Sequence, residues 1–123
     1  MSEEHAFTVE EANGLIPELS RALVAIRDAH REILAGAQPF RRRAPTDGGG
    51  RQPDGYWEAM ATLRRELEGL IGKGIVLRDA ETGLIDFPSR RDDREVFLCW
   101  RLGEKQVEYW HGPESGFAGR RPL

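Results

Sequence analysis

Apolar residues recur at helical spacing in two stretches of the N-terminal half of the chain. The first stripe is spaced 4-3-4-3-4 and consists of Leu15, Leu19, Ala22, Ile26, Ala29 and Ile33. The second is spaced 4-3-4-3 and consists of Tyr56, Met60, Leu63, Leu67 and Leu70. Two matched stripes joined by a connecting segment predict an antiparallel helical hairpin.

Local signals set the expected ends of the two helices. Thr8 followed three residues later by Glu11 is a capping box, which predicts a helix start at this point. Because a proline ring opposes a continuous helix, we expect a break near Pro17 within a first helix over residues 8–35. Gly36 is the expected stop, and the second helix is expected over residues 56–72.

The rest of the chain lacks helical periodicity. Residues 36–55 are rich in proline, glycine and charge, which predicts a flexible loop. From residue 75 the period becomes two, and strands are expected at 75–79, 84–88, 95–102 and 106–111, with a tail over 112–123 packed across the sheet. Short connections favour antiparallel neighbours, so the fold class is α+β: a helical hairpin packed on a four-stranded antiparallel β-meander at 75–111.

Alternation divides the third expected strand into two faces. Trp100 belongs to the bulkier apolar set, which should meet the helices, whereas Cys99 and Arg101 point the other way. Asp86 on the neighbouring strand shares their direction. The face taken by His111 depends on a register that the sequence leaves open.

Composition narrows the class of protein. The 123 residues fit a single domain over 1–123, and a net charge of −3 gives no global basic field for nucleic acid or membrane. The acidic start predicts no signal peptide, and no apolar run approaches the ~20 residues of a membrane span. Cys99 is the only cysteine, which excludes an intrachain disulfide and a CxxC zinc pair and fits a cytoplasmic protein. The basic run at 41–43 is interpreted as a solvated loop, so nucleic acid is not an expected partner.

Several ordered blocks resemble a known family. They are the opening Phe7–Asn13 and Leu15–Leu19, then Gly83–Pro88, Leu98–Glu104, Tyr109–His111 and Gly116–Pro122. These blocks are similar to those of the bacterial and archaeal DUF2203 proteins and leave out residues 36–55. The resemblance implies no activity, because that family is named for its unknown function. An acidic residue commonly follows the Trp-His pair in such proteins, whereas Gly112 stands here.

Polar residues on the strands suggest an anion site. Asp86 and Arg101 on neighbouring strands can form a bidentate pair, which serves either as a structural ion pair or as a fixed arginine for a carboxylate or phosphate. Arg120 and Arg121, which lie beside glycines in the tail, can also bind an anion or simply tie the tail to the sheet.

A second interpretation rests on Cys99 and His111. A thiolate, an imidazole and one carboxylate, from Asp86 or Glu114, would make a three-ligand metal site with an open position. A Cys–His nucleophile pair is a further alternative, and a lone cysteine in a strand is usually a small buried hydrophobe.

We therefore expect a non-catalytic module that binds a small anionic ligand or assembles, through Asp86, Cys99, Arg101, His111, Arg120 and Arg121. A homo-oligomer, with a dimer favoured, is the expected state. The alternatives are a metal- or thiol-dependent enzyme using Cys99 and His111, and a helical-hairpin adaptor for another protein. The sequence names no cofactor and leaves open whether the protein is an enzyme.

Overall fold

Two helices precede one antiparallel sheet. The computed structural model describes residues 6–47 and 55–123, with the backbone alone over 37–47. The elements are α1 (Val9–Asp47), α2 (Tyr56–Lys73), β1 (Val76–Asp79), β2 (Leu84–Arg91), β3 (Arg94–Arg101), β4 (Tyr109–His111), the 3-10 turn η1 (Phe117–Gly119) and β5 (Arg121–Pro122). The strand order is β1-β2-β3-β4-β5. The α+β class is confirmed, but over the described residues the sheet has five strands rather than four.

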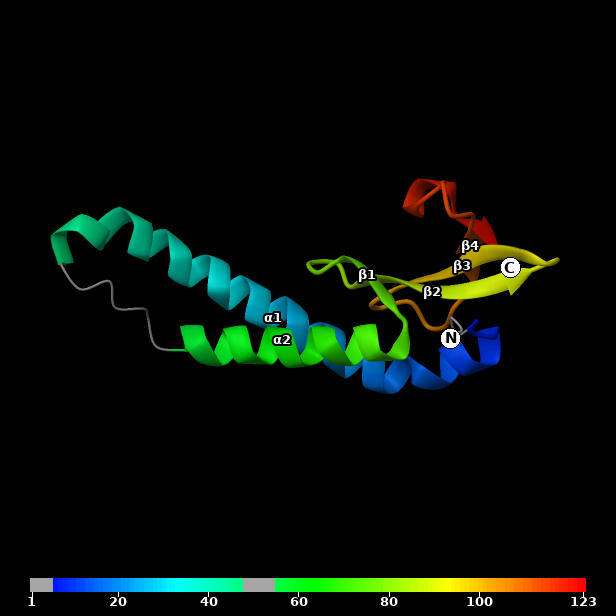
Figure 1. Ribbon diagram of the computed structural model, residues 1–123, viewed down its shortest axis with the longest axis horizontal. Helices are drawn as coiled ribbons and strands as arrows, with labels where there is room; N and C mark the ends of the chain where they lie inside the picture. The colour runs from blue at the N-terminus through cyan, green and yellow to red at the C-terminus, as the bar shows by residue number, and fades with distance from the viewer. Residues whose placement is uncertain (1–5, 48–54) are drawn as a thin grey trace.

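The start of α1 follows the expected capping box. The Thr8 amide donates to Glu11 Oε1 at 2.9 Å, and the Glu11 amide donates to Thr8 Oγ1 at 3.0 Å. The expected break near Pro17 is wrong, because α1 is helical on both sides of this residue. The axis of α1 instead changes direction within its N-terminal third, drawn in blue (Figure 1). A proline within a helix removes one backbone hydrogen bond and commonly bends the axis without ending the helix.

The expected stop at Gly36 is also wrong. Gly36 is buried inside α1, and the helix continues to Asp47. Glycine in a helix costs only about 1 kcal/mol, which packing can offset, so it ends a helix only where the chain turns away. The predicted loop over 36–55 is therefore helical to Asp47, and residues 48–54 lie outside the described residues.

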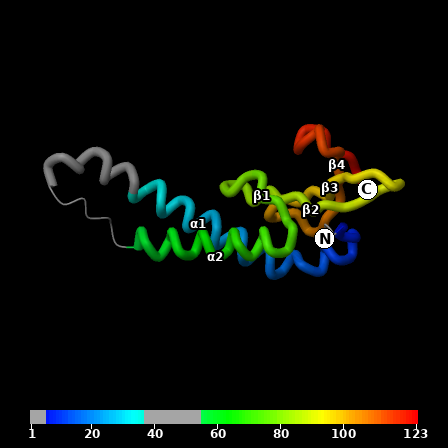
Figure 2. The backbone as a smooth tube through the Cα atoms, viewed as in Figure 1, coloured from blue at the N-terminus to red at the C-terminus, as the bar shows by residue number. Residues whose placement is uncertain are grey.

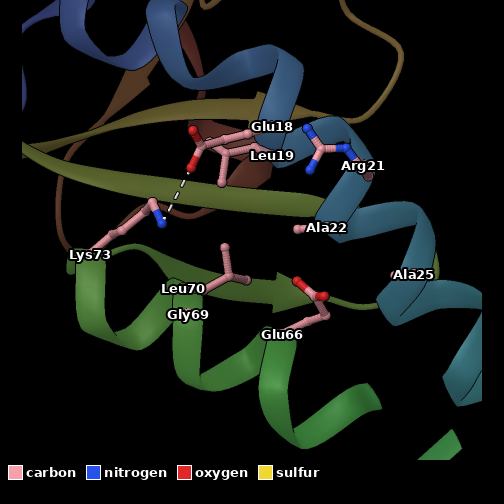
Figure 3. Close-up of a pocket in the computed structure, with 9 residues that line it drawn as sticks. All are labelled: Glu18, Leu19, Arg21, Ala22, Ala25, Glu66, Gly69, Leu70 and Lys73. Atoms are coloured by element: carbon pink, nitrogen blue, oxygen red, sulfur yellow. Dashed lines mark ion pairs between the residues drawn. The ribbon is translucent and has the colours of Figure 1, made fainter.

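The second helix lies against α1. Gly55 and Gly74 flank α2 with left-handed backbone angles, φ 89° and 83°, which suit glycine. A groove of about 160 Å³ lies between the two helices (Figure 3). Its rim is bridged by an ion pair between Lys73 Nζ and Glu18 Oε2 at 3.3 Å. The two helices thus form the expected hairpin, which projects beyond the sheet (Figure 2).

The sheet is layered between α1 and the C-terminal tail (Figure 1). Its helix-facing side carries the core residues Ile85, Phe87, Leu98 and Trp100, each at most 3 % exposed. They form one cluster with Leu19, Leu23 and Ile26 of α1 and Leu70 of α2. The predicted division of β3 is correct for Trp100, which lies in this core.

The hairpin between β2 and β3 fixes the register of the central strands. Its two loop residues, Asp92 and Asp93, have φ of 54° and 67°. Positive φ at both positions is the geometry of a two-residue turn whose twist matches the flanking strands. The resulting ladder pairs Asp86 with Cys99 and Ile85 with Trp100.

The C-terminal part differs from the expected fourth strand and tail. Within 106–111 only Tyr109–His111 form a strand, because the Val107 amide donates to Asn13 Oδ1 of α1 at 2.7 Å. Arg121 and Pro122 of the tail add β5 beside β4. Trp110 pairs with Leu98 and packs against the helix-side core.

Over the described residues, no helix combines the length and the apolar character needed to cross a lipid bilayer.

Candidate functional site

The face of the sheet that points away from the helices, here called the outer face, carries buried polar residues. Asp86 of β2 is the cross-strand partner of Cys99 of β3, and Tyr109 of β4 is the partner of Cys99 on its other side. His111 is the partner of Phe97, two residues from Cys99, so it shares this face. The register left open by the sequence is therefore settled, and His111 lies with Asp86 and Cys99.

Asp86, Cys99 and His111 converge on one point and are here called the triad. Their ligand atoms, a carboxylate oxygen, Sγ and an imidazole nitrogen, all lie within 4.8 Å of one another. The three side chains are almost fully buried, at 2 %, 1 % and 2 % exposure. Burying such polar atoms is costly unless each of them has a partner.

The two carboxylate oxygens of Asp86 have different surroundings. Oδ2 accepts a hydrogen bond from Arg78 Nε at 2.7 Å and lies 3.0 Å from His111 Nε2. Oδ1 is buried and has no hydrogen-bond partner among the described residues. An unpaired buried acceptor costs about 1–3 kcal/mol, so a structural ion pair explains only one half of this carboxylate.

The imidazole of His111 is held in one orientation. Its Nδ1 lies 2.8 Å from the Gly112 carbonyl oxygen, and because a carbonyl only accepts, Nδ1 carries the hydrogen. Nε2 then faces the other triad atoms, where it either donates a second proton to Asp86 or presents its lone pair to an ion. Metal-bound histidines commonly hold their second ring nitrogen in this way, on a backbone carbonyl.

The thiol of Cys99 is poorly suited to act as a free nucleophile. Burial raises its pKa to about 12 from an ordinary 9.0, and the negative charge of Asp86 and a hydrogen bond between the thiol and that carboxylate act in the same direction, whereas the positive charge of Arg120 opposes them. At neutral pH the thiol is therefore protonated, whereas catalytic cysteines have a lowered pKa. A bound divalent cation would displace this proton and make the sulfur a strong ligand.

The other candidate residues lie around the triad rather than in it. Arg101 is exposed, and its guanidinium carbon lies 5.3 Å from the centre of the Phe117 ring. The predicted pairing of Asp86 with Arg101 is wrong, because the register places Arg78 at the carboxylate. Glu114 is exposed and does not belong to the cluster of ligand atoms found in the described part of the chain.

The two tail arginines differ from each other. Arg121 stacks at 5.6 Å on Trp110, which belongs to the helix-side core, so it lies apart from the triad. Arg120 lies on the outer face: its guanidinium carbon is 4.0 Å from the centre of the Tyr109 ring. One of its Nη atoms donates to both carboxylate oxygens of Glu104, at 3.0 and 2.8 Å.

Sequence reasoning missed three participants, Arg78, Glu104 and Tyr109. Alternation along β1 could have found Arg78, since Val76 pairs with Asp86 and Arg78 is two residues further along. The irregular register between Leu77 and Asp79 hides this relation from simple pattern reading. Glu104 and Tyr109 become visible only when the tail is placed over the sheet.

A cavity of about 400 Å³ lies beside the triad and is lined in part by Val76, Pro88 and Phe97. The Phe97 ring centre is 5.5 Å from that of His111, and the Arg78 guanidinium carbon lies 5.1 Å from the Phe97 ring centre. Phe97 therefore lines the cavity and also contacts the His111 ring of the triad.

Comparisons with known proteins give one finding about family and none about activity. A family model described as "Uncharacterized conserved protein (DUF2203)" matches residues 5–123. No curated protein and no solved structure matches the chain.

Proposed function

Because the chain belongs to the DUF2203 family, which is described only as uncharacterised, we propose its function from the site alone: it binds one divalent transition-metal ion through Asp86, Cys99 and His111. A carboxylate, a thiolate and an imidazole are all ligands of Zn²⁺, which is the ion that this mixed set fits best. Three protein ligands leave a fourth, open position. The reduced cysteine that such a site needs supports a cytoplasmic location.

The observation that carries the proposal is the buried Oδ1 of Asp86. Asp86 belongs to the same cluster as Cys99 and His111, and its Oδ1 has no hydrogen-bond partner in the described part of the chain. A cation at the centre of the triad would satisfy this oxygen, the imidazole lone pair and the sulfur together. The ion pair with Arg78 engages only Oδ2 and leaves Oδ1 without a geometric hydrogen-bond partner.

The required rearrangement is small. Zinc–nitrogen and zinc–oxygen bonds of about 2.0–2.1 Å and a zinc–sulfur bond of about 2.3 Å place tetrahedral neighbours about 3.3–3.5 Å apart. In the structure, His111 Nε2 and Asp86 Oδ2 are 3.0 Å apart, and all ligand atoms lie within 4.8 Å. Shifts of about 1 Å therefore convert the triad into a coordination set.

Two surrounding contacts support a metal ion at this place. The Gly112 carbonyl fixes the His111 ring so that Nε2 points toward the triad. Arg78 orients Asp86 through Oδ2 and leaves Oδ1 available. Such outer contacts typically contribute 10- to 100-fold, in order of magnitude, to metal affinity.

A metal-free anion pocket at the triad is less well supported. An anion placed against the triad would meet the negative charge of Asp86, while Arg101 and Arg121 are stacked on aromatic rings elsewhere. The thiol-enzyme alternative is opposed by the raised pKa of Cys99, which keeps the sulfur protonated.

The direct test is metal analysis of untagged protein by mass spectrometry, before and after reconstitution with Zn²⁺. We expect one ion per chain in wild type, and loss of binding in D86N, C99A and H111Q. The matched controls are D28N and H30Q, since Asp28 and His30 lie outside the triad. Wild-type protein that holds no zinc after reconstitution would contradict the proposal.

A second function, self-assembly through α2, is favoured by a separate observation. Trp57, Met60 and Ile71 are large apolar residues that are 66 %, 40 % and 72 % exposed on this helix. Arg64 and Glu68 lie between them as an exposed i,i+4 pair. In a two-fold antiparallel pairing of α2 with a second copy, each arginine faces the glutamate of the other copy.

Charge exchange tests this assembly by light scattering coupled to size-exclusion chromatography. R64E and E68R should each weaken the dimer through like-charge contacts, and the double variant R64E/E68R should restore it. Wild-type protein that is monomeric at high concentration would refute the assembly and leave the helical-hairpin adaptor as the prediction for this surface.

A further inference from the structure

Arg120 has an unusual environment for an arginine near a protein surface. Its side chain is only 10 % exposed, and its guanidinium carbon lies 4.0 Å from the centre of the Tyr109 ring and 4.6 Å from that of Phe117. Tyr109 is the cross-strand partner of Cys99. Arg120 is therefore positioned by two aromatic rings on the same face as the triad and directly beside it.

The hydrogen bonds of Arg120 leave one buried donor unused. One Nη atom donates to both oxygens of Glu104, which also accepts a hydrogen bond at Oε1 from the Arg101 amide at 2.8 Å. The Nε of Arg120 is buried and has no partner among the described residues. Arginine normally uses several of its five donors, so this N–H indicates a missing acceptor.

The outer face thus holds two buried polar atoms without partners, Oδ1 of Asp86 and Nε of Arg120. One is an acceptor and the other is a donor: Asp86 is the cross-strand partner of Cys99 on one side, and Arg120 stacks on Tyr109, the cross-strand partner of Cys99 on the other side. A cation satisfies the first and an anion satisfies the second. A metal ion that carries an anionic ligand would satisfy both.

The charge count gives the charge of that ligand. A divalent ion supplies two positive charges, and Arg78 and Arg120 supply one each. The Asp86 carboxylate, the Cys99 thiolate and the Glu104 carboxylate supply three negative charges, so the loaded site has a net charge of +1. A monoanion brings this sum to zero, whereas a dianion would overshoot. The Arg78 side chain is 43 % exposed, so solvent screens its charge more than that of the other groups.

We infer that the open coordination position of the proposed metal takes a small monoanion, bound through an oxygen that also accepts the Nε–H hydrogen bond of Arg120. This inference rests on the proposed metal site. The ligand class is a short carboxylate such as formate or acetate, because protein ligands that are at most 2 % exposed favour a small ligand. The metal ion and the Nε–H of Arg120 would then both contact the carboxylate. Two such contacts fix the orientation of the bound carboxylate as well as its position.

A purely structural role of Arg120 explains fewer observations. A clasp between the tail and the sheet requires only the bond to Glu104 and the stacking on Tyr109 and Phe117. It does not require a donor that is buried without a partner. The two roles predict different results when Glu104 is replaced. A purely structural contact between the tail and the sheet is lost when either Arg120 or Glu104 is replaced, whereas an anion site becomes more positive when Glu104 is replaced.

The experiment uses the full chain loaded with Co²⁺, whose visible absorption bands respond to the fourth ligand. Wild-type protein titrated with formate or acetate should show a saturable spectral change, and the neutral amides formamide and acetamide should not produce it. R120Q should weaken the binding of acetate at least about tenfold while the protein still holds one Co²⁺ per chain. E104Q should strengthen the binding of acetate, because it removes one negative charge and weakens the competing contact of Glu104 with Arg120.

The matched control is R91Q, because Arg91 also stacks on an aromatic ring, at 4.8 Å from the centre of Trp110, but lies outside the site. Its acetate affinity should equal that of wild type. If R120Q fails to fold, E104Q decides: stronger binding of acetate supports the inference, and unchanged or weaker binding overturns it. Cobalt binding with no response to either carboxylate would overturn this inference alone, whereas failure to bind cobalt would overturn the proposed metal site as well.

Discussion

The two faces of the sheet are built from alternate residues of the same strands, yet they differ in how completely their polar groups are satisfied. The helix-facing side carries Phe87 and Trp100, which are fully buried in the apolar core, and the indole N–H of Trp100 donates to the Glu104 carbonyl at 3.1 Å. The outer face is equally buried at Asp86 and Cys99 but contains an orphan acceptor. Among these residues, the polar group of Trp100 on the helix-facing side has a hydrogen-bond partner, whereas Oδ1 of Asp86 on the outer face has none.

This difference suggests a division of labour along each strand. Side chains that point to the helices contribute mainly to stability, and the outward side chains Asp86, Cys99 and His111 hold the proposed metal ion. Core and triad residues alternate along the same strands. Packing of the core therefore holds the strand backbone in place, and the backbone in turn positions the side chains of the triad. Variants on the two faces should therefore separate stability from ligand binding.

The largest effect is expected on the helix-facing side. Truncation of Phe87, which is 0 % exposed, in F87A should lower the free energy of unfolding by about 3–5 kcal/mol. F97A removes the same group from the outer face, where the ring is only half-buried, and should cost about 1–2 kcal/mol. Chemical denaturation measures both values, and equal losses would show that the two faces contribute alike.

The next prediction concerns the thiol of Cys99 in metal-free protein. A pKa of about 12 instead of 9.0 lowers the thiolate fraction near neutral pH about a thousandfold. Alkylation in the folded state should therefore be slower than in denaturant by about that factor. If Cys99 is alkylated in the folded protein about as fast as in the denatured chain, the thiol is accessible to solvent and the prediction is wrong.

The same pKa has a consequence for stability. The folded state holds the Cys99 proton more tightly than the unfolded state, so its contribution to stability is complete below about pH 9 and is lost between about pH 9 and pH 12. Metal-free wild type should therefore show an alkaline loss of stability that C99A lacks. Unfolding curves recorded across this range provide the measurement, and identical pH profiles would contradict the assignment.

Metal removal should have a somewhat smaller effect on stability than truncation of the core. Zinc at about 100 times its dissociation constant should raise the free energy of unfolding by about 2.7 kcal/mol, and a chelator should reverse the change. The shift should vanish in H111Q and persist in H30Q. A zinc-dependent shift of the same size in H111Q would place the ion elsewhere.

The smallest effect is expected at the start of α1. T8A removes the side-chain acceptor of the Glu11 amide and should cost about 1 kcal/mol, with no change in metal content. E11Q keeps an acceptor for the Thr8 amide and should remain close to wild type. A larger loss in E11Q than in T8A would assign the stabilisation to the charge of Glu11 instead.

Local rules predicted the parts of the fold that depend on near neighbours. The capping box at Thr8 and Glu11 and the opposite directions of Cys99 and Trp100 follow from spacing alone. The ends of α1 did not follow, because continuation through Pro17 and Gly36 depends on tertiary packing that outweighs propensity. The short strand β5 was missed for the same reason, since it exists only beside β4.

The residues of the triad could be picked out from the sequence as site candidates, but their mutual contacts could not. Asp86, Cys99 and His111 stood out because polar side chains are rare on otherwise apolar strands. Their convergence required the register between β3 and β4, which a tight turn does not fix there. The prediction paired Asp86 with Arg101, whereas the structure pairs it with Arg78. This error also arises from the unknown register, because strand order alone does not specify which arginine reaches the carboxylate.

The central claim, that the outer face is a metal site, is tested most directly by titrating metal-free protein with Co²⁺ and recording its ultraviolet and visible absorption. The account predicts a thiolate-to-cobalt charge-transfer band that saturates at one equivalent in wild type and is absent in C99A. Saturation at one equivalent in both proteins, or the absence of the band in wild type, would contradict it.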